Sequence, residues 1–319
     1  MSSNLITRSI FLSSKTGDRR LETLYRWSKS VDEEDLDAWE LKLMMADVAF
    51  SADKQVKRKR WQLSSFLTTR EEADELRAKF GGGVTEVRPD DWQPSAEAGA
   101  DSLLKIRDTL LVTESEDEAV LESLRNEYPE RILLSFPPQL AFGTGGHPTT
   151  AGCLRFLTDL SKQRRNKPWR ILDLGCGSGI LAVAAAKLGA SEVVAVEIDE
   201  MALGYAKRNA EQHTVAEKIQ FIAGDVIPML ESGELGKFDV IVANLFSSLL
   251  ISLLPHFPKG LAEDGEMVIS GFLTSQAREV EAAAKATGIP LFDFLRRGKW
   301  VAALGRRSTL RREMSLVMI

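Results

Sequence analysis

The sequence predicts an α/β protein built on a doubly wound, mostly parallel sheet, preceded by a smaller α+β unit. From Arg170 onward, short apolar runs of strand length alternate with helical patterns. These runs are apolar at nearly every position, which is typical of parallel strands covered on both faces. At the end, two strand patterns follow each other with only Arg297-Gly298 between them, so an antiparallel hairpin should close the sheet.

The composition is that of a globular protein. Hydrophobic residues make up 44% and charged residues 27% of the 319, which excludes a disordered or fibrous chain. The net charge of -5 argues against generic binding to a phosphate backbone. Cys153 and Cys176 are too few for a disulfide framework or a zinc site, and we expect no metal. With no apolar run of about 18 residues and no signal-peptide pattern, we expect a cytoplasmic protein with no membrane partner.

Residues 1–90 predict a small unit with the order β-α-β-β-α-β, which is the ferredoxin-like arrangement. We expect its strands at residues 5–12, 38–44, 60–67 and 84–88, and its helices at 18–28 and 70–80. The second helix is the best marked, because Thr69 and Glu72 have capping-box spacing and Gly81 follows the last residue.

A linker and lead-in segment, residues 91–130, separates this unit from the sheet domain at 131–307. It contains a strand pattern at 103–113 and then seven carboxylates between Glu114 and Glu130. A solvated surface helix explains that acidic run better than a metal site does. Residues 308–319 form a basic tail.

The sheet domain should contain five strands before the hairpin. We expect them at residues 170–174, 192–198, 219–223, 238–243 and 266–271. Helices should follow at 179–188, 200–212, 247–257 and 274–286, and the hairpin should pair 292–296 with 299–304. The right-handed crossover rule then brings the carboxyl ends of the parallel strands to one edge.

A glycine-rich loop follows the first of these strands, with the sequence Asp173-Leu-Gly175-Cys-Gly177-Ser-Gly179. Glycines at a strand-to-helix turn let a ligand approach the backbone, and the helix offers free N–H groups. The glycines fall at positions 1, 3 and 5, whereas a dinucleotide fingerprint has them at 1, 3 and 6. A tight turn without a ligand is the alternative.

Two further residues at strand ends point to the same edge. Glu197 ends the second strand and can accept both hydroxyl protons of a ribose. Asp199 competes for that role, but it could instead cap the next helix. Asn244 ends the fourth strand and presents an uncharged amide, unless it caps the helix that begins near Ser247.

A second glycine-rich loop, Leu140–Thr150, lies about 25 residues before the first one. Thr149 and Thr150 open a helix, and a linker ending in a helix cap is the alternative interpretation. The loop residues that we expect to shape a substrate site are Phe142, Gly143, Thr144, Gly145 and His147.

Together, residues 141–150, 173–181 and 242–244 closely resemble the PrmA family of class I, S-adenosylmethionine-dependent methyltransferases, which act on a ribosomal protein of the large-subunit stalk base. The sequence ending His147-Pro-Thr-Thr150 is the most specific part of this resemblance. Class I methyltransferases also have a seven-stranded sheet closed by an antiparallel hairpin. The sequence departs from the family at Gly146, where the family usually has Thr, and at Glu197, where it often has Asp.

The resemblance implies an S-adenosylmethionine-dependent methyltransferase that modifies lysine ε-amines or the N-terminal amine of that ribosomal protein. It implies that Asn244 is catalytic and that the cofactor is bound by Thr150, Asp173, Gly175, Gly177, Gly179, Glu197 and Asn244. A small N-terminal domain captures the substrate in this family. We find no assured general base, since His147 could equally shape the loop.

Other interpretations remain open at this point. The chain could methylate a lysine of another protein, or it could be a catalytically silent scaffold. The basic segment 54–60 could touch ribosomal RNA or could be a solvated loop, and no specific nucleic-acid partner is expected.

Overall fold

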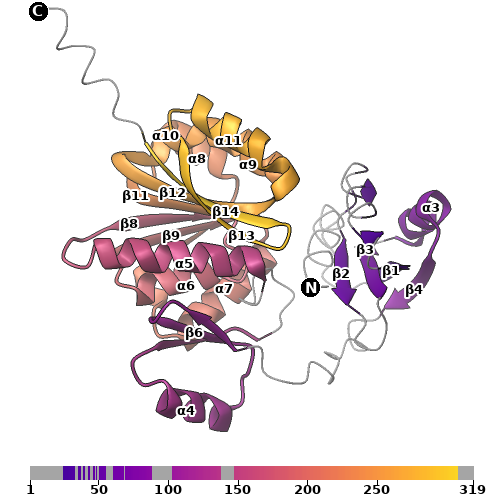
Figure 1. Ribbon diagram of the computed structural model, residues 1–319, viewed down its shortest axis with the longest axis horizontal. Coiled ribbons are helices and arrows are strands. Elements are labelled where there is room, and N and C mark those ends of the chain that lie inside the picture. The colour runs from indigo at the N-terminus through magenta and orange to yellow at the C-terminus, as the bar shows by residue number, and fades with distance from the viewer. Residues whose placement is uncertain are drawn as a thin grey trace, which may run out of the picture. The chain divides into compact units, whose positions relative to one another are not determined.

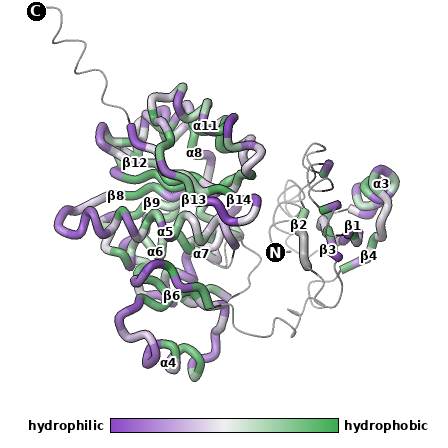
Figure 2. The backbone as a smooth tube through the Cα atoms, viewed as in Figure 1, coloured by the Kyte–Doolittle hydropathy of each residue, from purple (hydrophilic) through white to green (hydrophobic). Residues whose placement is uncertain are grey.

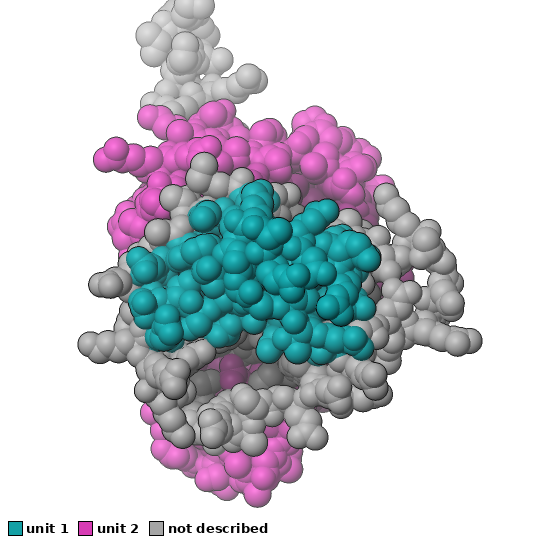
Figure 3. Space-filling model, turned by 90° about the vertical axis from the view of Figure 1, so that its right-hand side faces the viewer, with its two compact units in different colours: residues 1–99, 138–142 teal, residues 100–137, 143–319 magenta. Residues whose placement is uncertain are grey.

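The computed structural model describes residues 24–32, 35, 36, 39, 42, 43, 46, 48, 50–54, 60–67, 69–87, 103–137 and 147–307 (Figure 1). The chain divides into two compact units, shown in different colours in Figure 3. The first comprises residues 1–99 and 138–142, and the second comprises 100–137 and 143–319.

The first unit contains a four-stranded antiparallel sheet in the order β2-β3-β1-β4. Its strands are β1 (Leu24–Asp32), β2 (Ser51–Lys54), β3 (Arg60–Leu67) and β4 (Gly83–Val87), with helix α3 (Arg70–Phe80) between the last two. Trp27 and Phe80 pack edge to face in its core. Both bonds of the expected capping box between Thr69 and Glu72 are present.

Two of the elements expected in this unit are wrong. The region 18–28 was expected to be helical, but β1 begins at Leu24, and Trp27 and Val31 are buried along it. Within the strand expected at 38–44, the described residues Trp39, Lys42 and Leu43 are helical instead, and Leu36, Trp39 and Leu43 have the i, i+3, i+7 spacing of one helix face. The strand expected at 5–12 lies outside the described residues, and the ferredoxin-like fold itself stays a prediction.

The second unit begins with a small sheet in the order β5-β6-β7. Its strands are β5 (Leu104–Ile106), β6 (Leu110–Thr113) and β7 (Ile132–Ser135), with α4 (Glu118–Glu127) between β6 and β7. The single strand expected at 103–113 is in fact a hairpin that turns at Arg107, whose φ is 51°. The surface-helix prediction is confirmed, because α4 buries only Leu121 and Leu124. Strand β7 was not predicted.

The main sheet has seven strands in the order β10-β9-β8-β11-β12-β14-β13. They are β8 (Arg170–Leu174), β9 (Glu192–Glu197), β10 (Ile219–Ala223), β11 (Phe238–Asn244), β12 (Leu261–Leu273), β13 (Leu291–Arg297) and β14 (Trp300–Arg306). Six of the strands run in one direction, and β14, between β12 and β13, runs antiparallel to both. The predicted seven-stranded class I methyltransferase sheet with a terminal hairpin is therefore confirmed.

Helices cover both faces of this sheet (Figure 1). One face packs against α5 (Pro148–Gln163), α6 (Ile180–Lys187) and α7 (Glu200–Gln212). The other packs against α8 (Val226–Ser232), α9 (Ser247–Leu253), α10 (Phe257–Gly260) and α11 (Ala277–Ala286). The helix expected at 247–257 is divided, since Pro255 and Pro258 lack the N–H groups that would continue it. Helix α8 was not predicted.

The central strands are mostly apolar, as Figure 2 shows by their largely green colour. Helix α5 approaches β14 so closely that a Cβ atom on Gly152 would lie 2.5 Å from the Cβ of Ala302. At the far end of α5, Arg164 donates to the buried carboxylate of Glu266, which also accepts from Arg306 of β14. Among the described helices, none is both long and apolar enough to cross a membrane.

Candidate functional site

The site residues meet at the carboxyl edge of the main sheet, on either side of β8. Strands β9 and β10 extend the sheet in one direction from β8, and β11 and β12 extend it in the other. Such a reversal opens a crevice beyond the carboxyl ends of the strands, and ligands of open α/β sheets bind there. The Gly175 loop, Glu197 and Asn244 follow or end β8, β9 and β11.

The glycine loop uses backbone conformations that other residues rarely adopt. Gly175, Gly177 and Gly179 have φ values of 65°, 54° and 78°. Gly179 also lies against α7, where a Cβ would be 2.9 Å from the Cβ of Ala206. Among the described residues no side chain caps the start of α6, so N–H groups of its first turn can face a polar ligand.

The Glu197 carboxylate is held at the end of β9 by three backbone N–H groups. Its Oε2 accepts from Gly177 at 2.9 Å, and its Oε1 accepts from Ile198 and Asp199 at 2.9 and 3.1 Å. The side chain therefore connects the tip of β9 to the glycine loop. Asp199 has the other role considered for it, because its carboxylate accepts from Met201 N–H and caps α7.

Asp173 is a buried carboxylate near the end of β8. It is 1% exposed, its oxygens form no hydrogen bond of good geometry in the described part of the chain, and the backbone N–H of Ala182 in α6 lies close enough to favour its ionised form. Burial raises the pKa of this group to about 7. A buried carboxylate with only the Ala182 N–H beside it is costly to keep ionised, so a cationic or donor group next to it would stabilise the ionised form.

Asn244 joins the end of β11 to the start of α5. Its Nδ2 donates to the hydroxyl of Thr150 at 3.3 Å, while its Oδ1 is buried with no partner among the described residues. Helix α9 is capped instead by the Phe246 backbone, so Asn244 is not a helix cap. The amide oxygen is thus an oriented acceptor available to a ligand.

His147 caps α5 rather than standing apart as a base. Its Nδ1 accepts the Thr149 N–H at 3.4 Å and lies 2.6 Å from the Thr149 hydroxyl, and its ring meets Trp300 edge to face at 4.9 Å. Burial lowers the pKa of His147 to about 4. Phe142, Gly143, Thr144 and Gly145, from the same loop, lie outside the described residues.

Comparison with known proteins agrees with this geometry. The family model described as ribosomal protein L11 methyltransferase (PrmA) matches residues 20–308. The chain belongs to this family. PrmA proteins are S-adenosylmethionine-dependent methyltransferases, so the cofactor expected from the sequence is that of the family.

Individual PrmA relatives cover different shares of the chain. A ribosomal protein L11 methyltransferase of Pelobacter propionicus is 32% identical over 81% of this chain and 80% of its own length. One from Desulfitobacterium hafniense is 38% identical over 56% of this chain, and the match spans only 54% of that relative. A solved ribosomal protein L11 methylase of Lactobacillus delbrueckii subsp. bulgaricus has a TM-score of 0.53 and 27% identity, covering 65% of this chain and 98% of its own.

Several residues at this PrmA site were not predicted from the sequence. Gly271 of β12 has a φ of 96°, and a Cβ there would lie 2.2 Å from the Leu245 carbonyl oxygen, so the strand passes very close behind the residue after Asn244. Ile198 and Phe246 are exposed by 56% and 54% although both are apolar. Ile198 directly follows Glu197, and Phe246 lies two residues beyond Asn244. An apolar residue just after a polar strand end was therefore the signal in the sequence that could have identified both.

His213 and the two cysteines are buried residues of this fold. His213 stacks on Phe136 and accepts the Ser135 N–H, which joins α7 to the small sheet. Cys153 and Cys176 are buried and free, and burial raises the pKa of both thiols.

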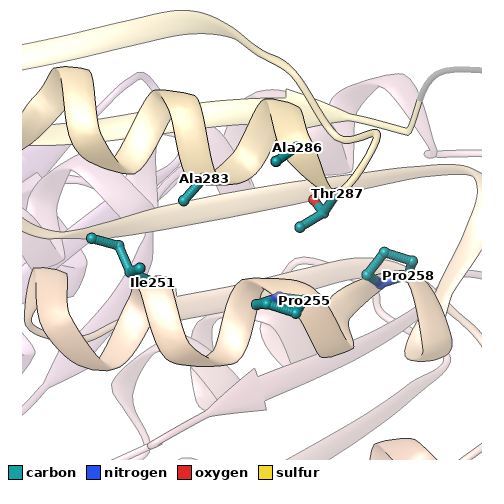
Figure 4. A pocket seen from close by; sticks show the side chains of 6 residues that line it. All are labelled: Ile251, Pro255, Pro258, Ala283, Ala286 and Thr287. Atoms are coloured by element: carbon teal, nitrogen blue, oxygen red, sulfur yellow. The ribbon is translucent and has the colours of Figure 1, made fainter.

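An apolar groove of about 480 Å³ lies on the other helical face, between α9–α10 and α11 (Figure 4). Its walls are Ile251, Pro255, Pro258, Ala283, Ala286 and Thr287. It contains no ionisable side chain and lies apart from the residues described above, so it has no part in the chemistry of this PrmA chain.

Proposed function

We propose that this chain methylates ribosomal protein L11, using S-adenosylmethionine, on lysine ε-amines, the N-terminal α-amine or both. The reaction belongs in the cytoplasm, the compartment that two free cysteines favour. The observation that carries the proposal is the buried, unpartnered Oδ1 of Asn244 beside the glycine loop, in a chain of this family.

The residues at the carboxyl edge fit the cofactor. Gly175, Gly177 and Gly179 would lie along its methionine part, and the Glu197 carboxylate would accept its ribose hydroxyls. Asp173 places a buried carboxyl at this edge, and a cation such as S-adenosylmethionine beside it would favour its ionised form. The exposed Ile198 would contribute apolar surface next to the adenine. When bound, the cofactor supplies a methyl group that its sulfonium already activates.

The protein's part in the reaction is to align a neutral amine. A lysine amine has a pKa of about 10.4 in water, so the site must favour its deprotonated form. Asn244 Oδ1 can accept one amine N–H and direct the lone pair, because Thr150 fixes the other end of the amide. Such positioning requires no strong base, and His147, with its Nδ1 facing Thr149, serves as the helix cap.

The first unit would capture the substrate protein at the stalk base. The basic segment 54–60 connects β2 to β3, and its middle residues 55–59 lie outside the described residues. Incidental contact of this segment with ribosomal RNA is part of the proposal. A fragment starting near Asp101 should still bind the cofactor but should methylate L11 poorly. Normal methylation by the folded fragment would contradict this division of roles.

Labelling of L11 tests the proposal directly. Purified protein is incubated with methyl-labelled S-adenosylmethionine and L11 from the same host, and the label is located by mass spectrometry. We expect label on lysines or the N-terminus of L11 with the wild type, and at least a hundredfold slower labelling with Asn244→Ala, whose cofactor binding by calorimetry should weaken far less because the glycine loop and Glu197 remain. Label on another protein would discard the ribosomal substrate, and absence of cofactor binding would indicate a silent scaffold.

A further inference from the structure

A groove of about 420 Å³ opens beside the candidate site, between the first turns of α5, the end of β13 and β5. Its walls combine apolar and cationic side chains, namely Leu104, Pro148, Leu295, Arg155, Arg296 and Arg297. We call it the arginine groove. None of the residues lining it is acidic.

The arginine groove lies close to the acceptor end of the site. Pro148 is the first residue of α5, two positions before Thr150, which bonds Asn244. Strand β13 is antiparallel to β14, which is antiparallel to β12, so Arg297 ends β13 at the same edge of the sheet as Asn244. The register from Asn244 through Ser270 and Ala302 to Leu295 places β13 three strands along this edge from Asn244, roughly 14 Å at about 4.8 Å per strand, which a few extended residues of a bound chain can span.

Its positive charge is not neutralised within the described part of the chain. Arg155, Arg296 and Arg297 form no ion pair there, and Asp159, one turn further along α5, is held by Arg107 at 2.5 Å. Arg155 is half-buried, and burial together with the charges of Arg297 and Arg107 lowers its pKa. Like charges held together are costly, and a bound anion would relieve that cost.

We propose that the arginine groove binds an acidic segment of the substrate protein, next to the amine that is methylated. This inference rests on the proposed function. Carboxylates pair with arginine in a bidentate manner, and Leu104 and Leu295 give the groove apolar walls that suit a peptide. An RNA backbone is the less suitable occupant, because it offers no apolar side chains to Leu104 and Leu295.

Charge removal in the groove tests this on the full chain. The triple variant Arg155→Gln/Arg296→Gln/Arg297→Gln should raise KM for L11 at least tenfold, with kcat and the Kd of S-adenosylmethionine within twofold of wild type. The rise of KM with salt should also become shallower. The matched control Arg165→Gln/Arg278→Gln removes exposed arginines elsewhere on the second unit and should leave KM unchanged. An unchanged KM in the triple variant would overturn the proposal.

A second measurement does not depend on methylation of L11. Fluorescence anisotropy at low ionic strength compares a labelled hexaglutamate peptide with a labelled 12-nucleotide RNA. We expect the wild type to bind the peptide and the triple variant to bind it at least tenfold more weakly. Equal peptide binding by both proteins, or tighter RNA binding through the same arginines, would contradict the inference. If the wild type does not methylate L11, the proposed function is wrong. The peptide-binding measurement still shows whether the arginine groove binds an acidic chain.

Discussion

The side-chain amide of Asn244 donates a hydrogen bond to the hydroxyl of Thr150, which lies 94 positions earlier in the chain. This one contact holds the tip of β11 against the first turn of α5. It also fixes which end of the amide faces the ligand, since the nitrogen is used and the oxygen is left as the acceptor.

Replacing Thr150 with Val should remove the hydrogen bond that orients the Asn244 amide, without changing the size of the side chain. We expect kcat to fall about tenfold, equivalent to about 1.4 kcal/mol, and the free energy of unfolding to fall by about 1 kcal/mol. Steady-state kinetics with saturating L11 and urea unfolding measure the two effects. Thr158→Val is the control, because Thr158 is also buried in α5 but its hydroxyl donates to the Leu154 carbonyl. It should lose stability and keep kcat, and an equal loss of kcat in both variants would contradict the role of Thr150.

Glu197→Ala should weaken cofactor binding at least tenfold, about 1.4 kcal/mol. The change removes the acceptor proposed for the ribose and the bond that positions the Gly177 N–H. Calorimetry with S-adenosylmethionine gives the Kd. Asp199→Ala serves as the comparison, since it removes only the cap of α7 and should cost about 1 kcal/mol of stability with little change in Kd. Unchanged binding by Glu197→Ala would move the ribose contact elsewhere.

Cofactor binding should release a proton from Asp173. The pKa of this carboxyl is raised to about 7, so below pH 7 it is mostly protonated in the free protein. A bound cation favours the ionised form, so the apparent Kd should rise as the pH falls below 7, by up to about tenfold per pH unit. Calorimetry at pH 6 in two buffers of different ionisation enthalpy measures the released proton. Asp173→Asn should abolish both the release and this pH dependence, and a wild type that releases no proton would refute the assignment.

Breaking the buried ion pairs of Glu266 should destabilise the second unit. Glu266 is 2% exposed and accepts from Arg164 and Arg306. Glu266→Gln should lower the free energy of unfolding by about 2–3 kcal/mol, because two arginines lose their partner and Arg164 is itself largely buried. Urea unfolding gives the value. On the surface, Glu118→Gln in α4 should cost under about 0.5 kcal/mol, and similar losses in the two variants would show that burial is not the cause.

The sheet of the second unit was predictable because its strands are long enough and apolar enough to admit one interpretation. Strand β10 and helix α7 have the predicted bounds, Ile219–Ala223 and Glu200–Gln212. Near the N-terminus the same rules failed at β1, where Leu24, Trp27 and Val31 also satisfy helical spacing. Local patterns there are short, and tertiary packing decides between them.

The candidate site was likewise predictable from the sequence only in part. The positions of Asp173, Glu197 and Asn244 follow from the rule that strand ends share an edge, so the sequence alone places them together. Their contacts do not follow from it. The bond between Thr150 and Asn244 depends on how α5 packs on β14, and the contact of His147 with Trp300 joins residues from opposite ends of the domain. The arginine groove likewise combines residues from three distant segments.

The close approach of Gly152 to Ala302 has a consequence for synthesis of the chain. Helix α5 supplies Thr150 to the site, yet it packs on β12 and β14, and β14 ends only at Arg306. Until Trp300–Arg306 has been synthesised, α5 lacks one of the two strands on which it packs, and the contact between Thr150 and Asn244 lacks part of its support. The residues of the acceptor site are therefore all made before the strand that completes the packing beneath them.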